Sequence, residues 1–454
     1  MVKKIIAYSI SFFSKGHERT LLAKKNIFYS LILKGGSILI GLILVPLTIN
    51  YVNPSKYGIW LTLSSIISWF SFFDIGLGHG LRNKITESNA KNNYEDSKIF
   101  ISTTYCILTI ISLVIFLAFW IINHFINWNI ILNTKNFSII ELQQIVILLF
   151  GVFCLQFVFQ IINNVLTACH SQSLVSLIYV IGQVFVLLII YGLTKTSSGS
   201  LIYLVLAIGG VPVLIQLIAS IWFYNNAYKF VAPSIKLINL KYAKSLLSVG
   251  GYFFLIQLGG LFLYQTDNLI VTQIFGPKEV TTFNVVYKMF SIITMVFAII
   301  MTPFWSSFTD SYAKGDMQWI KNSLFNIEKL WIVMSIAAVI LFFASPFLFK
   351  LWLHNSSINI PVSFSLSMVL YVIAFSWQTI HAVFLNGIGK IRLQLYLVVG
   401  SSLINIPMAI FFGKRLGLAG ITLSNTFLFL IMGITLFYQT RKIVAGTAKG
   451  IFNK

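Results

Sequence analysis

Four ionisable side chains interrupt stretches of the sequence that are otherwise almost wholly apolar: Lys34, Asp74, Asp267 and Lys288. A charge at the centre of a bilayer costs about 2.5–3.5 kcal/mol on insertion scales, so each of these residues needs a partner, a water-filled cavity or a function. We interpret the two lysines as groups that could bind an anionic ligand, and the two carboxylates as gating or ion-coupling groups. The structural alternative is a pair of salt bridges, Lys34 with Asp74 and Asp267 with Lys288, or side chains that snorkel.

Amide and imidazole side chains form a second set of candidates in three apolar segments, one of which also contains Asp267. Several are spaced three or four residues apart, which places them on one face of a helix. We interpret this set as the lining of a hydrated cavity in which polar groups replace water around sugar hydroxyls; the alternative is hydrogen bonding between neighbouring helices. The residues are Gln156, Gln160, Asn163, Gln257, Asn268, Gln378 and His381.

The sequence lacks the residue patterns of metal sites, disulfide frameworks and nucleotide hydrolysis. The six histidines have no metal-ligand spacing, and the three cysteines lie in apolar stretches without a disulfide or zinc pattern. No G-x-x-x-x-G-K-[ST] motif is present, so the chain does not hydrolyse nucleotides through a P-loop. We therefore expect no catalytic residues, no metal and no cofactor, with proton or sodium coupling as the open possibility.

The composition indicates the elements that position these residues. Of 454 residues, 57% are hydrophobic and only 9% are charged, whereas a soluble domain has about 25% charged residues. Because backbone groups in lipid must be satisfied internally and a bilayer core takes about 20 apolar residues per helix, the sequence predicts an all-α polytopic membrane protein. We expect twelve spans, at residues 27–51, 57–78, 99–123, 142–168, 174–194, 200–224, 246–274, 281–309, 326–350, 362–386, 391–413 and 417–440.

The distribution of positive charge predicts the orientation. The formal net charge is +21, and 22 of the 32 lysines and arginines fall in the tails and loops on one side of the predicted spans. Positive residues are retained on the cytoplasmic side, so both termini are expected in the cytoplasm. The basic balance is thus explained by membrane topology beside anionic headgroups, and we expect no nucleic-acid partner.

Three weak internal matches favour a duplication of six helices. Their offsets are 215, 223 and 218 residues: Gly35-Gly36 with Gly250-Gly251, Pro54-Ser55-Lys56 with Pro277-Lys278-Glu279, and Gln160-x-x-Asn163-x-Val165 with Gln378-x-x-His381-x-Val383. We predict a cytoplasmic tail (1–26), a first six-helix bundle (27–224), a basic cytoplasmic linker (225–245), a second bundle (246–440) and a C-terminal tail (441–454).

Three segments carry a resemblance to a known family. Residues 53–58 read NPSKYG, residues 69–83 read WFSFFDIGLGHGLRN, and residues 303–310 read PFWSSFTD. This pattern resembles the polysaccharide biosynthesis family of O-antigen and capsule flippases, within the multidrug/oligosaccharidyl-lipid/polysaccharide exporter superfamily. The aspartate-glycine stretch around Asp74 is the most specific part, and the twelve spans resemble that family along the whole chain.

The resemblance implies a fold, a substrate and a location. The fold is two six-helix bundles around a central cavity that opens alternately to each side, as in multidrug and toxin extrusion transporters. The substrate is an undecaprenyl-diphosphate-linked oligosaccharide, moved from the cytoplasmic to the outer leaflet of a bacterial inner membrane. Cationic groups would face the diphosphate, here Lys34, Lys288 and the rim residue Arg82. Membrane lipids, and a polysaccharide polymerase with its chain-length machinery, are the implied partners.

Two other functions remain open from the residues alone. One is a cation-coupled antiporter of drugs or metabolites, which has the same hydropathy and in-span charges. The other, from a different class, is a membrane-embedded glycan polymerase or transferase. The predicted outer loops are short, the longest at about residues 124–141, and contain no constellation of Arg, His or Asp. This argues against the enzyme.

Overall fold

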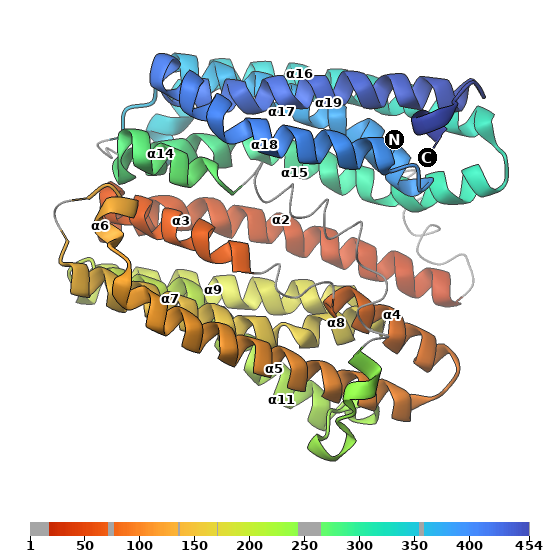
Figure 1. Ribbon diagram of the computed structural model, residues 1–454, viewed down its shortest axis with the longest axis horizontal. Helices are drawn as coiled ribbons and strands as arrows, with labels where there is room; N and C mark the ends of the chain where they lie inside the picture. Colours follow the sequence, from red (N-terminus) through yellow and green to blue (C-terminus); the bar gives the residue numbers. More distant parts are fainter. Residues whose placement is uncertain are drawn as a thin grey trace, which may run out of the picture. The chain divides into compact units, whose positions relative to one another are not determined.

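The computed structural model describes residues 18–70, 77–134, 137–169, 171–243, 265–353 and 358–453, and every regular element within them is a helix (Figure 1). Ten helices in this part of the chain are long and apolar enough to cross a membrane. They coincide with ten of the predicted spans and confirm an all-α polytopic membrane protein. The other two predicted spans, 57–78 and 246–274, include residues outside the described part.

Contacts group the chain into two compact units. Unit 1 comprises residues 1–51, 71–126 and 140–250. Its α-helices are α2 (Glu18–Val52), α4 (Leu77–Ala90), α5 (Tyr94–Phe125), α7 (Ile139–Phe159), α8 (Ile161–Ala168), α9 (Gln172–Thr196), α10 (Leu201–Val205) and α11 (Val211–Asn225), with a π-helical turn at Leu206–Gly210 between the last two.

Unit 2 comprises residues 52–70, 127–139 and 251–454. Within it, α17 packs against α15, α16 and α19. The helices are α3 (Pro54–Ser68), α6 (Trp128–Ile131), α14 (Asp267–Phe275), α15 (Pro277–Ala313), α16 (Met317–Leu353), α17 (Val362–Gly387), α18 (Arg392–Leu416) and α19 (Leu418–Val444), followed by a 3-10 turn at Gly450–Asn453.

The grouping differs from the predicted bundles in two segments. The helices α3 and α6 come from the first half of the sequence but pack with α14 and α15 in unit 2. The division at residues 225–245 into two six-helix bundles stays a prediction.

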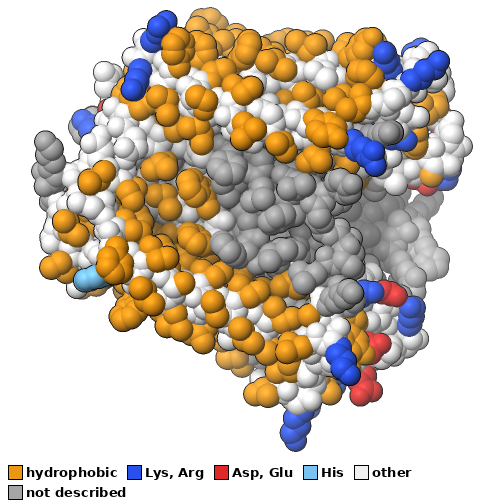
Figure 2. Space-filling model, in the orientation of Figure 1, with side chains coloured by type: hydrophobic (Ala, Val, Ile, Leu, Met, Phe, Trp, Pro, Cys, Tyr) orange, Lys and Arg blue, Asp and Glu red, His pale blue; other side chains and the backbone are white. Residues whose placement is uncertain are grey.

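The surface of the helices is what a lipid environment requires. In the space-filling view, hydrophobic side chains cover much of the visible surface along the helices, and most lysines and arginines lie toward helix ends (Figure 2). Large apolar side chains such as Leu113, Val114 and Trp120 on α5 are more than half exposed. A stripe of exposed apolar side chains this large is unfavourable in water. In a membrane these side chains are covered by acyl chains.

Two segments predicted as cytoplasmic loops have regular structure. In α4, residues Leu77, Leu81 and Ile85 are fully buried in the core cluster of unit 1, because their spacing of four places them on one face of a helix. The basic linker packs onto the start of α5, where the Ser102 hydroxyl accepts a hydrogen bond from the Ser234 backbone N–H (2.9 Å).

The helices α3 and α15 begin in the same way. Asn53 precedes α3 with φ 75° and ψ 162°, Gly276 precedes α15 with φ 87° and ψ 169°, and each is followed by proline at the first helical position. Proline is favoured there because the missing N–H would have no helical partner. This shared start coincides with the second of the three internal sequence matches.

Gly58 allows α3 to approach α15 closely. A Cβ atom at Gly58 would overlap the carbonyl oxygen of Pro277. The Thr281 hydroxyl donates to the carbonyl oxygen of Pro54 (2.6 Å), and the hydroxyls of Thr62 and Thr272 are hydrogen-bonded (2.6 Å). A glycine at this position lets the two backbones meet and these polar groups pair.

Replacing Gly58 by alanine is expected to destabilise unit 2. The new methyl group must displace the backbone at Pro277, and overpacking of this kind costs about 1–3 kcal/mol. Thermal unfolding of the purified protein in detergent measures the effect. Gly400→Ala, within α18, is the control because its Cβ would meet nothing within 4 Å. Equal unfolding temperatures for the two variants would contradict the close approach.

Candidate functional site

The spanning helices of unit 2 enclose a set of hydrogen-bonded polar side chains, which we call the polar cluster. Its members come from α3, α14, α15, α18 and α19 and from the residue that precedes α14. Polar side chains inside membrane segments are costly and are associated with partners or functions. The polar cluster consists of Ser65, Thr266, Asp267, Asn268, Asn284, Asn405 and Asn425.

Asp267, the first residue of α14, is held from one side by amides. The Asn425 amide nitrogen donates to Asp267 Oδ2 at 2.7 Å. The Asn405 amide in turn donates to Asn425 Oδ1, and the Thr266 hydroxyl donates to Asn405 Oδ1 at 3.4 Å. This chain of donors orients the carboxylate between α14, α18 and α19, and each bond in such a chain polarises the next.

The next residue of α14 faces the other way. The Asn268 amide nitrogen donates to the Ser65 hydroxyl at 2.7 Å, and the Asn284 amide nitrogen donates to Asn268 Oδ1 at the same distance. Consecutive helical residues point about 100° apart, so Asp267 and Asn268 connect different neighbours. Through this pair, α14 is tied to α18 and α19 on one side and to α3 and α15 on the other.

The second carboxylate oxygen of Asp267 has no hydrogen-bond donor among the described residues. The Oδ1 atom is buried and accepts no hydrogen bond from any residue that the structure describes. A buried acceptor without a partner costs about 1–3 kcal/mol, and more when it is charged, so such an atom calls for an explanation. Oxygen donors without sulfur or imidazole suit a proton or a hard cation.

The predicted ion pair between Asp267 and Lys288 is wrong: within the described residues, no salt bridge joins them. The two residues lie at similar distances along the chain from the turn at Gly276, which is why depth alone suggested a pair. Asp267 is instead turned toward α19. Lys288 follows Asn284 by four residues on α15, and therefore lies one helical turn further along the same face.

The other predicted anion-binding residues lie in unit 1. Lys34 is exposed on α2, and Arg82 is exposed on α4. Asp74 and Gln257 lie outside the described residues, so the predicted pair of Lys34 with Asp74 stays a prediction.

The amide face of the fourth predicted span coincides with a helix break. Gln160 separates α7 from α8, and its carbonyl accepts from the Asn163 N–H (2.9 Å) in place of the regular i→i+4 bond. Gln156 is exposed, and Asn163 Oδ1 has no hydrogen-bond partner among the described residues. A break at a polar position allows bending of the helix. The role of these amides as sugar contacts stays a prediction.

Gln378 and His381 share one face of α17 and are buried, His381 completely. The imidazole is enclosed by aromatic rings, with centroids 5.8 Å away at Trp377 and 5.2 Å away at Phe437. The two residues are thus packed in the interior of unit 2, and their predicted role as sugar-lining groups stays a prediction.

Sequence reasoning missed the four members of the polar cluster that lie outside the segment of Asp267. Ser65, Asn284, Asn405 and Asn425 were not among the candidates, although each asparagine lies in an otherwise apolar predicted span. A single amide in such a span is a signal in itself because it has to find a partner. Only the structure shows that all of them converge near Asp267. No group of three or more His, Cys, Asp or Glu side chains that could hold a metal occurs in the described part of the chain.

The comparisons with known proteins agree with this fold. A family model described as polysaccharide biosynthesis protein matches residues 23–308, and a MatE model matches residues 253–411. A Salmonella typhimurium protein named "Putative O-antigen transporter" is 26% identical, covering 86% of this chain and 89% of its own. A Yersinia pseudotuberculosis protein named for O-antigen export is 21% identical, over 78% and 81% of the two chains.

A solved structure has a similar backbone. The inward-facing conformation of a multidrug resistance MATE family transporter has a TM-score of 0.73 to this chain at 14% sequence identity. The alignment covers 92% of this chain and 95% of that transporter. At this identity the likeness shows the fold.

Removing the Asn425 amide is expected to destabilise the protein through Asp267. Asn425→Ala leaves both carboxylate oxygens without a donor among the described residues, and an unpaired buried group of this kind costs about 1–3 kcal/mol. The interaction free energy between Asp267 and Asn425 is measured by a double-mutant cycle. It compares the thermal unfolding in detergent of Asp267→Asn, Asn425→Ala and the double variant. We expect Asn425→Ala to cost less once Asp267 is neutral. Additive effects would show that the bond contributes nothing.

Proposed function

Because the chain belongs to the polysaccharide biosynthesis protein family, we propose that it is an O-antigen or capsule flippase and no enzyme. It moves an undecaprenyl-diphosphate-linked oligosaccharide from the cytoplasmic to the outer leaflet of a bacterial inner membrane. The named relatives and the transporter-like fold support this function. The sugar headgroup passes through the protein by alternating access, while the prenyl chain stays in lipid.

The polar cluster is the observation that carries the mechanistic part of the proposal. Asp267, at the start of α14, has one carboxylate oxygen held by Asn425 and the other without a hydrogen-bond partner among the described residues, so it is suited to take up a proton or a sodium ion at Oδ1. Uptake would change the charge at the point where α14 is tied to its neighbours, and so favour one of two helix arrangements. Asp267 is the coupling group, and Asp74 is its proposed counterpart in the first half of the sequence.

The diphosphate is proposed to meet the in-span lysines. Lys288 is partly buried, and its ammonium has no ion-pair partner among the described residues, so its charge remains available to an anion. Lys34 and Arg82 supply cationic groups on α2 and α4. The amides Gln156, Gln160 and Asn163 are proposed to contact the sugars, together with Gln257, Asn268, Gln378 and His381.

The proposed orientation of the chain rests on its positive charge. Twenty-two of the 32 lysines and arginines lie on one side of the predicted spans, which supports a cytoplasmic location for both termini. The product is then released where a polysaccharide polymerase and its chain-length machinery would consume it. These partners are proposed on the chemistry of the product.

Genetic complementation tests the function. In a strain whose own O-antigen flippase is deleted, the intact chain is expected to restore surface polysaccharide and to clear lipid-linked repeat units from the cytoplasmic leaflet. Surface glycan is measured on gels, and leaflet location by accessibility to an added glycosidase. If repeat units persist in the cytoplasmic leaflet although the protein is made, it is not the flippase for that substrate.

The same strain tests the role of Asp267. Asp267→Asn preserves the acceptor for Asn425 but cannot be protonated or bind a cation as a carboxylate. A coupling free energy of the usual size changes an equilibrium about tenfold, so we expect Asp267→Asn to lower transport by about tenfold. Asp310→Asn is the matched control, because Asp310 is exposed at the end of α15 and pairs only with Lys314 (2.7 Å) in the described residues. Full transport by Asp267→Asn would refute coupling at this residue.

A cation-coupled antiporter of small molecules is the second candidate, favoured by the MatE match to residues 253–411. It predicts that the chain lowers the sensitivity of a host to amphipathic cations and leaves surface polysaccharide unchanged. The complementation strain distinguishes the two functions, because only the flippase restores the glycan.

A further inference from the structure

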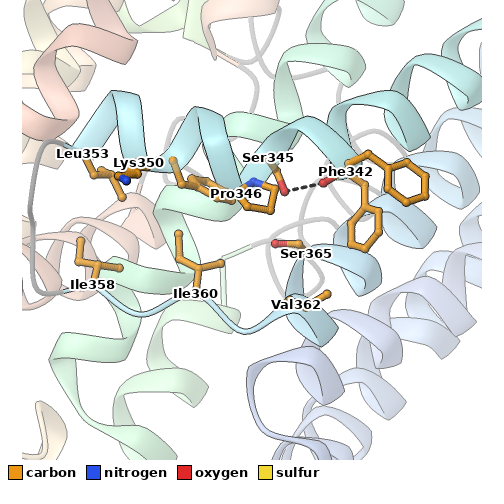
Figure 3. A pocket seen from close by; sticks show the side chains of 11 residues that line it. Phe342, Ser345, Pro346, Lys350, Leu353, Ile358, Ile360, Val362 and Ser365 are labelled. Carbon is orange, nitrogen blue, oxygen red and sulfur yellow. Dashed lines mark hydrogen bonds between the residues drawn. The ribbon is translucent and has the colours of Figure 1, made fainter.

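A groove lies at one end of unit 2, between the last turns of α16, residues 358–361 and the start of α17 (Figure 3). Eleven residues line it, and its volume is about 540 Å³. This volume is within the range of about 300–1,000 Å³ that is usual for small-molecule sites. The groove is separate from the polar cluster and shares no residue with it. We call it the α16–α17 groove.

Pro346 marks the groove wall on α16. Proline has no N–H, so the carbonyl of Phe342 loses its helical donor. The Ser345 hydroxyl takes its place and donates to that carbonyl at 2.8 Å. Across the groove, Ile358 and Ile360 approach from the segment before α17 (Figure 3). The α16 helix therefore continues through Pro346 to form this wall, because the Ser345 hydroxyl replaces the hydrogen bond that the Phe342 carbonyl loses.

The lining is apolar with one charge. Ser345 is engaged with Phe342, and most of the remaining lining consists of phenylalanine, leucine, isoleucine, valine and proline. Lys350, in the last turn of α16, is exposed and is the only charged residue in the described lining. A suitable occupant therefore combines a long apolar part with a single anionic group, because the described lining has no carboxylate to bind a cation.

The groove is open to lipid. Both α16 and α17 are long and apolar enough to cross a membrane. Phe343 is 76% exposed and Val362 is 66% exposed, although both contribute to the lining. In a membrane these surfaces contact acyl chains, and a lysine in the last turn lies near the headgroups, where it can reach a phosphate.

We propose that the α16–α17 groove binds an anionic phospholipid of the phosphatidylglycerol type. One acyl chain lies along the apolar wall, and the phosphodiester meets the Lys350 ammonium. One lysine matches the single negative charge of this headgroup. A zwitterionic headgroup would bring an ammonium with no carboxylate to receive it, and a prenyl diphosphate would bring more negative charge than one lysine neutralises.

Lipid retention measured by native mass spectrometry tests the site. The purified full-length chain in mild detergent is exposed to equal amounts of phosphatidylglycerol and phosphatidylcholine with identical acyl chains. A lysine near the membrane surface attracts anionic lipid enough for a preference of about fivefold for phosphatidylglycerol. Lys350→Gln is expected to abolish this preference. Lys414→Gln, which changes a lysine in the last turn of α18, is the matched control and should keep it.

A second variant tests the apolar wall with the charge intact. Val362→Trp fills the mouth of the groove and is expected to lower the retention of both lipids. Equal retention of the two lipids by the unchanged protein overturns the proposal, whether or not the variants fold. An undiminished preference in Lys350→Gln overturns it as well. Displacement of phosphatidylglycerol by an equal amount of undecaprenyl phosphate would assign the groove to the prenyl substrate instead.

Discussion

The hydrogen bond from Asn425 to Asp267 is the interaction on which the interior of unit 2 depends. A bilayer offers no water to a carboxylate, so the charge has to be stabilised by groups that the protein itself supplies. Asn425 is in turn held by Asn405, and Asn405 by Thr266. Since these residues come from the start of α14 and from α18 and α19, the charge of one side chain determines how those helices can pack.

The same constraint explains the contacts of the next residue of α14. Asn268 pairs with Ser65 and Asn284, so the helix is tied to α3 and α15 by a second set of polar contacts. The contact between α3 and α15 is possible because Gly58 lets the backbones meet at Pro277. A change at Oδ1 of Asp267 would therefore act on helices from both halves of the sequence, as the ion coupling proposed for this residue requires.

The sequence predicted the membrane architecture more fully than the site. Ten spans are recovered because an apolar stretch of about 20 residues has one structural solution in lipid. The helix α4 was missed because its polar exposed face masked the stripe of Leu77, Leu81 and Ile85. Asp267 was recognisable as a charge out of place. That Asn405 and Asn425 are its partners was not recognisable, because hydropathy reports depth in the membrane and says nothing about which helix faces which.

Reconstitution tests the central claim, that this chain alone moves a lipid-linked oligosaccharide across a bilayer, most directly. Purified protein is placed in liposomes that contain an undecaprenyl-diphosphate-linked repeat unit, and the fraction of glycan accessible to an external glycosidase is followed over time under an imposed proton or sodium gradient. Our account predicts that the protein makes the inner-leaflet glycan accessible, at a rate that one of the two gradients changes. Accessibility that stays at the level of protein-free liposomes under every gradient would contradict it.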